Sequence, residues 1–78
     1  MTEQVIYQSP LMYRILRDGD GLVIEVVVGG IAMSSVRVRL TEDEALAYER
    51  DGSRASDKLA NAIMASPRFG GRSYPGSS

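Results

Sequence analysis

The chain of 78 residues contains no cysteine, no histidine and no tryptophan. Without cysteine it can form neither disulfides nor thiolate metal sites. Without histidine it lacks the commonest metal ligand and the commonest general base at neutral pH. Lysine occurs once, at Lys58, and every other basic residue is arginine. We therefore expect a protein that is not an enzyme and that carries no cofactor or metal.

Charge of one sign is not in excess either, because nine basic residues stand against ten acidic ones for a formal net charge of −1. This balance provides no long-range field toward nucleic acid or anionic lipid. No apolar run approaches the ~18 residues of a membrane-spanning helix, and residues 1–4 lack the basic start of a signal peptide. We expect a cytoplasmic protein whose partner is another protein chain, with nucleic acid disfavoured and no membrane contact.

The length and the 44% hydrophobic content suit one small folded domain. After Pro67 the composition shifts to glycine, serine and arginine, which do not favour regular structure. The sequence therefore predicts a single α+β domain over residues 1–66, followed by a flexible tail over residues 67–78.

The first half of the chain alternates polar and apolar residues between glycine-rich turns, a pattern typical of strands. We predict a three- or four-stranded antiparallel meander. Arg14 should face Glu25 and Ile15 should face Ile24, because this register gives one consistent apolar face. The predicted strands cover residues 12–17, 22–28 and 31–40, with residues 4–8 as a further edge strand.

The connection to the third strand contains Gly29-Gly30, which favours a two-residue hairpin turn that pairs Val28 with Ile31. In this strand the apolar residues are odd-numbered at first, at Ile31 and Met33, and even-numbered afterwards, so a regular strand would place them on opposite faces of the sheet. A bulge that places residues 34–35 together opposite Glu25 would restore one apolar face. With it, the core face of the third strand would hold Ile31, Met33, Val36, Val38 and Leu40, while Arg37 and Arg39 would point away.

The second half is helical in pattern and begins with a capping box at residues 41–44. We predict one helix to about Arg50, ended by Gly52, and a second that ends at Ser66 before Pro67. One continuous helix with an interior glycine is the alternative, since a seven-residue repeat runs through Ala45, Tyr48, Gly52, Ala55, Leu59 and Ala62. The helices should pack on one face of the sheet through Leu46, Leu59 and Ile63.

The patterns that suggest chemistry have simpler explanations. The glycines of residues 18–21 and 29–30 join strand to strand, whereas a phosphate loop runs from a strand into a helix. Asp18 and Asp20 supply too few oxygen ligands for calcium and are ordinary turn residues. The acids of residues 42–44 diverge around a helix start, where they favour the helix dipole.

The face of the sheet away from the helices, the outer sheet face, is too apolar for free solvent in the predicted register. An apolar stripe rimmed by charges commonly marks a protein contact. The alternative is that the N-terminal segment or the tail covers it. The predicted partner-binding residues are Met12, Arg14, Leu16, Val23, Glu25, Val27, Arg37 and Arg39.

These observations predict a small non-enzymatic protein-binding module that acts through the outer sheet face. In size, charge balance and lack of catalytic residues the chain is similar to small bacterial immunity, antitoxin and inhibitor proteins, a likeness of architecture alone. The alternatives are a homodimeric structural module of unknown role and a binder of single-stranded nucleic acid. The last would use the arginines and aromatic residues at Arg14, Arg37, Arg39, Arg68, Phe69, Arg72 and Tyr74.

Overall fold

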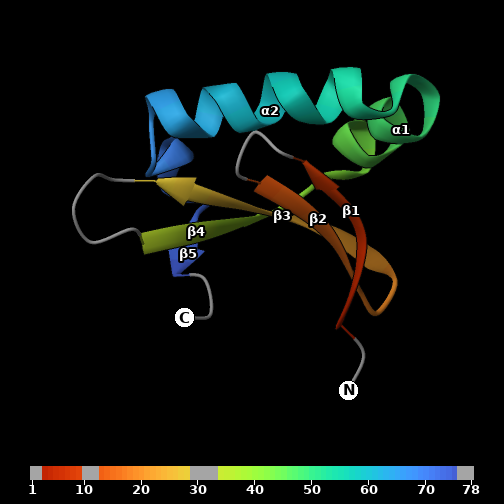
Figure 1. The fold of residues 1–78 in the computed structure, drawn as a ribbon, viewed down its shortest axis with the longest axis horizontal. Helices are drawn as coiled ribbons and strands as arrows, with labels where there is room; N and C mark the ends of the chain where they lie inside the picture. The colour runs from red at the N-terminus through yellow and green to blue at the C-terminus, as the bar shows by residue number, and fades with distance from the viewer. Residues whose placement is uncertain (1–2, 10–12, 29–33, 76–78) are drawn as a thin grey trace.

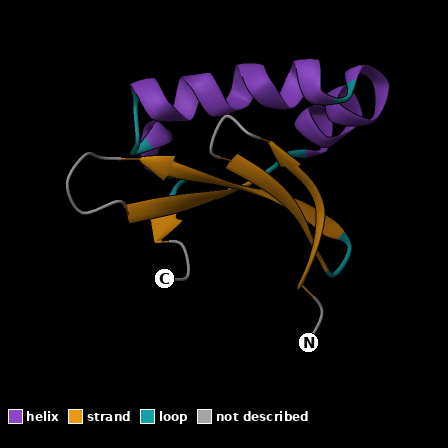
Figure 2. Ribbon diagram, in the orientation of Figure 1, coloured by secondary structure: helices purple, strands orange, loops and turns teal. Residues whose placement is uncertain are grey.

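The computed structural model describes residues 3–9, 13–28 and 34–75. In this part of the chain, five strands form one antiparallel sheet in the order β1-β2-β3-β4-β5, and two helices lie on one side of it (Figure 1, Figure 2). The predicted α+β meander is confirmed, with five strands in place of three or four. The elements are β1 (Glu3–Ser9), β2 (Tyr13–Asp18), β3 (Gly21–Val28), β4 (Ser34–Arg39), α1 (Glu42–Asp51), α2 (Ser53–Ala65), the short helical turn η1 (Phe69–Gly71) and β5 (Tyr74–Pro75).

The pairing of β2 with β3 has the predicted register. Arg14 lies opposite Glu25, and the other predicted pairs across these two strands agree as well. The further edge strand is also confirmed, because β1 pairs with β2. The register of that pairing shifts between Val5 and Tyr7, which makes Ile6 the extra residue of a β-bulge.

The predicted pairing across the Gly-Gly turn is wrong. Val28 lies opposite Ser34 and not opposite Ile31, so residues 29–33 separate the paired ends of the two strands. The predicted turn itself lies outside the described residues, as do Ile31 and Met33. A two-residue turn is too short for the observed pairing, whatever the conformation of this connection.

The predicted bulge in the same strand is wrong too. β4 pairs regularly with β3, with Ser35 opposite Val27 and Arg37 opposite Glu25. The observed register differs from the predicted one by two residues, and a shift of two keeps every side chain on its own face. Val38 is therefore buried on the helix-covered face, as expected.

Helix α1 begins with the predicted capping box. Thr41 Oγ1 accepts a hydrogen bond from the Glu44 amide at 3.2 Å, and Glu44 Oε1 accepts one from the Thr41 amide at 2.8 Å. At Gly52 the backbone has φ 65° and ψ −137°, a conformation open to glycine and to few other residues. The segment therefore forms two helices, and the alternative of one continuous helix is wrong. Neither described α-helix is long and apolar enough to cross a membrane.

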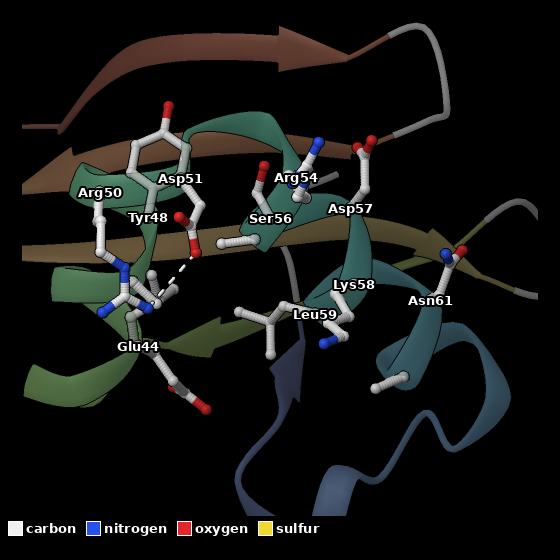
Figure 3. A pocket seen from close by; sticks show the side chains of 14 residues that line it. Glu44, Tyr48, Arg50, Asp51, Arg54, Ser56, Asp57, Lys58, Leu59 and Asn61 are labelled. Carbon is white, nitrogen blue, oxygen red and sulfur yellow. Dashed lines mark hydrogen bonds and ion pairs between the residues drawn. The ribbon is translucent and has the colours of Figure 1, made fainter.

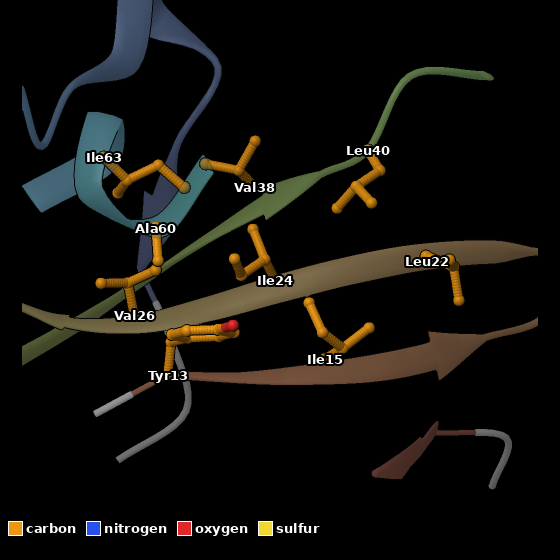
Figure 4. Close-up of a cluster of buried hydrophobic side chains, with 9 residues drawn as sticks. All are labelled: Tyr13, Ile15, Leu22, Ile24, Val26, Val38, Leu40, Ala60 and Ile63. Carbon is orange, nitrogen blue, oxygen red and sulfur yellow. The ribbon is translucent and has the colours of Figure 1, made fainter. Parts of the chain in front are cut away.

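The apolar core lies between the sheet and α2 (Figure 4). Leu59 and Ile63 pack there as predicted, whereas Leu46 does not, because its side chain is 56% exposed. Helix α1 contacts the core through Ala45 and Tyr48 instead. Successive helical residues point roughly 100° apart, so an assignment one residue out of phase turns a core side chain to solvent. The buried cluster comprises Tyr13, Ile15, Leu22, Ile24, Val26, Val38, Leu40, Ala60 and Ile63.

A polar contact also fastens α2 to the sheet. The hydroxyl of Tyr13, on β2, lies 2.7 Å from Ser56 Oγ and donates a hydrogen bond to the Asp57 carboxylate. Burial, and after it the hydrogen bond to Asp57, raises the pKa of Tyr13 to about 12. The hydroxyl thus remains a protonated donor at neutral pH, and it satisfies two polar groups of the helix.

The C-terminal segment corrects the expectation that residues 67–78 lack regular structure, because η1 leads into β5 and β5 pairs with β4. Arg72 holds this segment in place. Its guanidinium donates to the Glu44 carboxylate at 2.7 and 3.1 Å and to the Arg39 carbonyl at 3.0 Å. It also lies 5.0 Å from the centre of the Phe69 ring. The hydrogen bond from Arg72 lowers the pKa of Glu44.

Candidate functional site

The apolar residues predicted to bind a partner are less accessible than expected. On the outer sheet face Leu16 is 2% exposed and Val23 is fully buried, while Val27 is half-buried. Met12 lies outside the described residues. We expected the accessible patch to centre on Val23 and Val27, but at Val23 a charge would enter the interior of the chain, and only Val27 is partly accessible.

The charged residues of the same set form a row across three strands, the charged row, made of Arg14, Glu25 and Arg37. Arg14 Nε donates to Glu25 Oε1 at 2.6 Å and Arg37 Nε donates to Oε2 at 3.4 Å, while the Ser35 hydroxyl adds a contact at 3.2 Å. Burial alone would raise the pKa of Glu25, but the hydrogen bond from Arg14 and the charges of both arginines outweigh it and lower that pKa. Glu25 is thus a buried carboxylate that stays ionised because it is paired.

Arg39, the last of the set, is engaged near the turn between β2 and β3. Its guanidinium lies 3.3 Å from Asp18 Oδ2, and it covers Gly21, where a Cβ would come within 2.2 Å of Nη1. The arginines of this face are therefore bound to acids of the same chain.

A second surface, which the sequence did not predict as a site, lies between the two helices. There α1 and α2 diverge from Gly52 and enclose a groove of about 750 Å³ (Figure 3). We call it the helical groove. Its apolar lining consists of Leu40, Ala47, Tyr48, Ala55, Leu59 and Ala62, and its charged lining consists of Glu44, Arg50, Asp51, Arg54, Asp57 and Lys58.

The apolar lining exists because α2 carries two apolar stripes. Ser56, Ala60 and Ile63 are buried against the sheet. Ala55, Leu59 and Ala62 form the second stripe, on the flank that faces the groove, and Ala62 is exposed. A surface helix needs only one apolar stripe to join its core, and Leu59 is half-buried and packs against that core as well, so the surface left for a further contact is centred on Ala62.

The sequence contained a signal for this groove. Ala55, Leu59 and Ala62 belong to the seven-residue repeat noted above, which is the spacing of residues that meet another helix. The repeat was interpreted as evidence for one long helix. These residues line a groove only because the turn at Gly52 directs α1 away from α2. The sequence pattern of each helix does not predict the angle between the two helices.

The hydroxyl groups that line the helical groove belong to Ser56 and Tyr48. Ser56 Oγ contacts the Tyr13 hydroxyl, which donates to the Asp57 carboxylate, and Ser56 itself donates to the Ser53 carbonyl at 3.2 Å. Burial raises the pKa of Tyr48, which keeps that phenol protonated. In the part of the chain that the structure describes, no group of three or more acidic side chains could hold a metal ion.

Comparison with models of protein families, with curated proteins and with solved structures found no match to this chain.

Proposed function

We propose that the protein is a non-enzymatic protein-binding module and that the helical groove receives a segment of a partner protein. The observation that carries this proposal is the second apolar stripe of α2, which the chain's own core uses only in part: Leu59 packs against the core, while Ala62 is exposed in the groove. Burial of apolar surface is the main driving force of protein association, and the exposed part of such a stripe contributes only when another chain covers it.

The shape of the groove favours a helical segment over a small molecule. The stripe repeats at intervals of four and three residues, from Ala55 to Leu59 to Ala62, and this interval matches the ridges of a second helix. Alanine at two of the three positions lets a partner backbone approach closely. Recognition of this type places the apolar face of an amphipathic helix into a groove.

The outer sheet face supports the same class of function less well. Leu16 and Val23 are buried, and the charged row is paired within the chain. What remains accessible there is Arg39, at 54% of its side chain, part of Arg14, and the apolar residues Val5, which lies opposite Leu16 and is 43% exposed, and Val27, which is half-buried. These groups would contribute to the edges of an interface, but the centre of the face, at Leu16 and Val23, is buried.

Selection from a displayed library of random peptides tests the proposal. The wild-type protein should enrich peptides whose binding is lost when Ala62→Arg places a long charged side chain in the groove. Met64→Arg is the matched control, because Met64 is also exposed and lies on the opposite flank of the same helix. Peptides that bind Ala62→Arg as tightly as the wild type, or selections that enrich no peptide, would overturn the proposal.

A further inference from the structure

Three basic residues line the helical groove. Arg50 stands near the end of α1, and Arg54 and Lys58 stand four residues apart on α2. On α2, Arg54 and Lys58 stand beside the apolar stripe, since residues four apart lie one above the other on a helix. A ligand that covers the stripe would therefore pass directly beside these cations.

The acids of the same lining are already engaged by groups of this chain. Glu44 accepts two hydrogen bonds from Arg72, Asp57 accepts one from Tyr13, and Asp51 pairs with Arg50 at 3.4 Å. Arg54 and Lys58, in contrast, have no acidic partner within 4.0 Å among the described residues. Asp57 keeps its negative charge, because its partner is a neutral hydroxyl, so once the two ion pairs are set aside the positive charges of Arg54 and Lys58 exceed it by one, although the whole chain carries a net charge of −1.

We propose that the segment bound in the helical groove is an acidic amphipathic helix of a partner protein. This inference rests on the function proposed above. Its apolar residues would cover Ala55, Leu59 and Ala62. A flanking row of aspartate or glutamate, spaced by three or four residues, would meet Arg54 and Lys58. The ion pairs would lie at the rim of the contact, where charge contributes mainly to the choice of partner and to the rate of association.

Two designed peptides provide the probe. Each has about 15 residues, roughly four helical turns, with the same leucine stripe, and the flanking positions hold glutamate in one peptide and lysine in the other. At low ionic strength the glutamate peptide should bind about tenfold more tightly than the lysine peptide, and added salt should reduce this difference. Fluorescence anisotropy of labelled peptides measures both affinities.

Reversal of the rim charge tests the assignment to residues. Arg54→Glu with Lys58→Glu should reverse the preference, so that the lysine peptide binds more tightly. Arg17→Glu with Arg68→Glu makes the same change in net charge at two exposed arginines outside the groove, and it should leave the preference for glutamate intact. Thermal unfolding of each variant shows whether the fold is kept.

The outcomes separate this inference from the proposed function. Equal binding of both peptides, lost in Ala62→Arg, would overturn the acidic partner but keep the groove as a binding surface. Reversal of preference in the control variant would overturn the assignment to the rim. A dimer in sedimentation that Ala62→Arg dissociates would identify the occupant as a second copy of this chain, and would overturn the partner proposed here.

Discussion

The two faces of the sheet are buried by different means. On the helix-covered face, Ile15 and Ile24 belong to a cluster of apolar side chains from the sheet that is covered by Ala60 and Ile63 of α2. On the outer sheet face, Leu16 and Val23 reach the same burial without a helix above them, beside the charged row. The centre of a sheet face that lacks a helical layer is therefore buried here, while its edge at Val5 is exposed, and parity along a strand does not decide which side chains a partner can reach.

The largest expected effects come from truncating buried side chains on each face. Ile15→Ala should lower the free energy of unfolding by about 3 to 4 kcal/mol, and Leu16→Ala by about 2 to 3 kcal/mol, because each leaves a cavity in packed surroundings. Urea denaturation measures both. A loss below about 1 kcal/mol for Leu16→Ala would show that the outer sheet face is loosely packed, and would restore it as an accessible surface.

The charged row should be nearly as sensitive. Glu25→Ala leaves two arginine side chains without their shared acid, and we expect a loss of about 2 to 3 kcal/mol. Glu25→Leu combined with Arg37→Met replaces the inner ion pair by apolar groups and should recover part of this loss. If the single and double variants are equally unstable, pairing is not the reason that Glu25 is tolerated at this position.

The same row predicts a dependence on pH. The pKa of Glu25 and that of Glu44 are lowered from an ordinary value of 4.5, so ionisation of each carboxylate favours the folded state. Their contribution is fully present above pH 4.5 and is lost as the pH falls through the lowered values. The free energy of unfolding should therefore decrease on acidification. Glu25→Gln should reduce the slope of this decrease, and an unchanged slope would contradict the role of Glu25.

On the helix-covered face the matching polar contact is that of Tyr13. Tyr13→Phe removes two hydrogen bonds to α2 and keeps the ring, so we expect a loss of about 1 to 2 kcal/mol. In the wild type the raised pKa means that stability is lost as the pH rises from 10 to about 12. This alkaline loss should be smaller in Tyr13→Phe, with Tyr74→Phe, at an exposed tyrosine, as the control.

The smallest effect is expected at the exposed rim of the outer sheet face. Arg39→Ala removes an ion pair with Asp18 in which both side chains are more than a third exposed, and such pairs contribute about 0 to 1 kcal/mol. A loss above about 2 kcal/mol would mean that the stem of Arg39 is needed to cover its strand neighbours. Arg39→Met, which keeps a long apolar stem, distinguishes the two contributions.

The sequence was sufficient for those parts of the fold that local rules determine. The register of β2 and β3 followed from a short Asp-Gly turn, and the start of α1 followed from its capping box. The register of β4 was predicted wrongly. We assumed a two-residue turn at Gly29-Gly30, and a bulge was then needed to keep the apolar residues of the strand on one face. Backbone pairing over residues 34–39 is a long-range choice that no local signal specifies.

The candidate site was harder to predict than the fold. The helical groove depends on which side of each helix packs against the sheet. For α1 the predicted side was wrong, because Ala45 and Tyr48 contact the core in place of Leu46. Burial on the outer sheet face was also missed. The alternation of residues along a strand predicts only which face of the sheet a side chain is on. It does not predict that Val23 is buried on the outer sheet face of the folded chain.

The bulge at Ile6 has a consequence for how this protein behaves at high concentration. β1 is an outer strand of the sheet, and Val5 and Ile6 are 43% and 38% exposed. A straight apolar edge of this kind would accept a strand from a neighbouring molecule, which would expose another edge in turn. The extra residue interrupts the regular spacing of amide and carbonyl groups along β1, so a strand from another molecule can pair with only part of it. One inserted residue thus opposes the edge-to-edge pairing of strands that leads to fibrous aggregation.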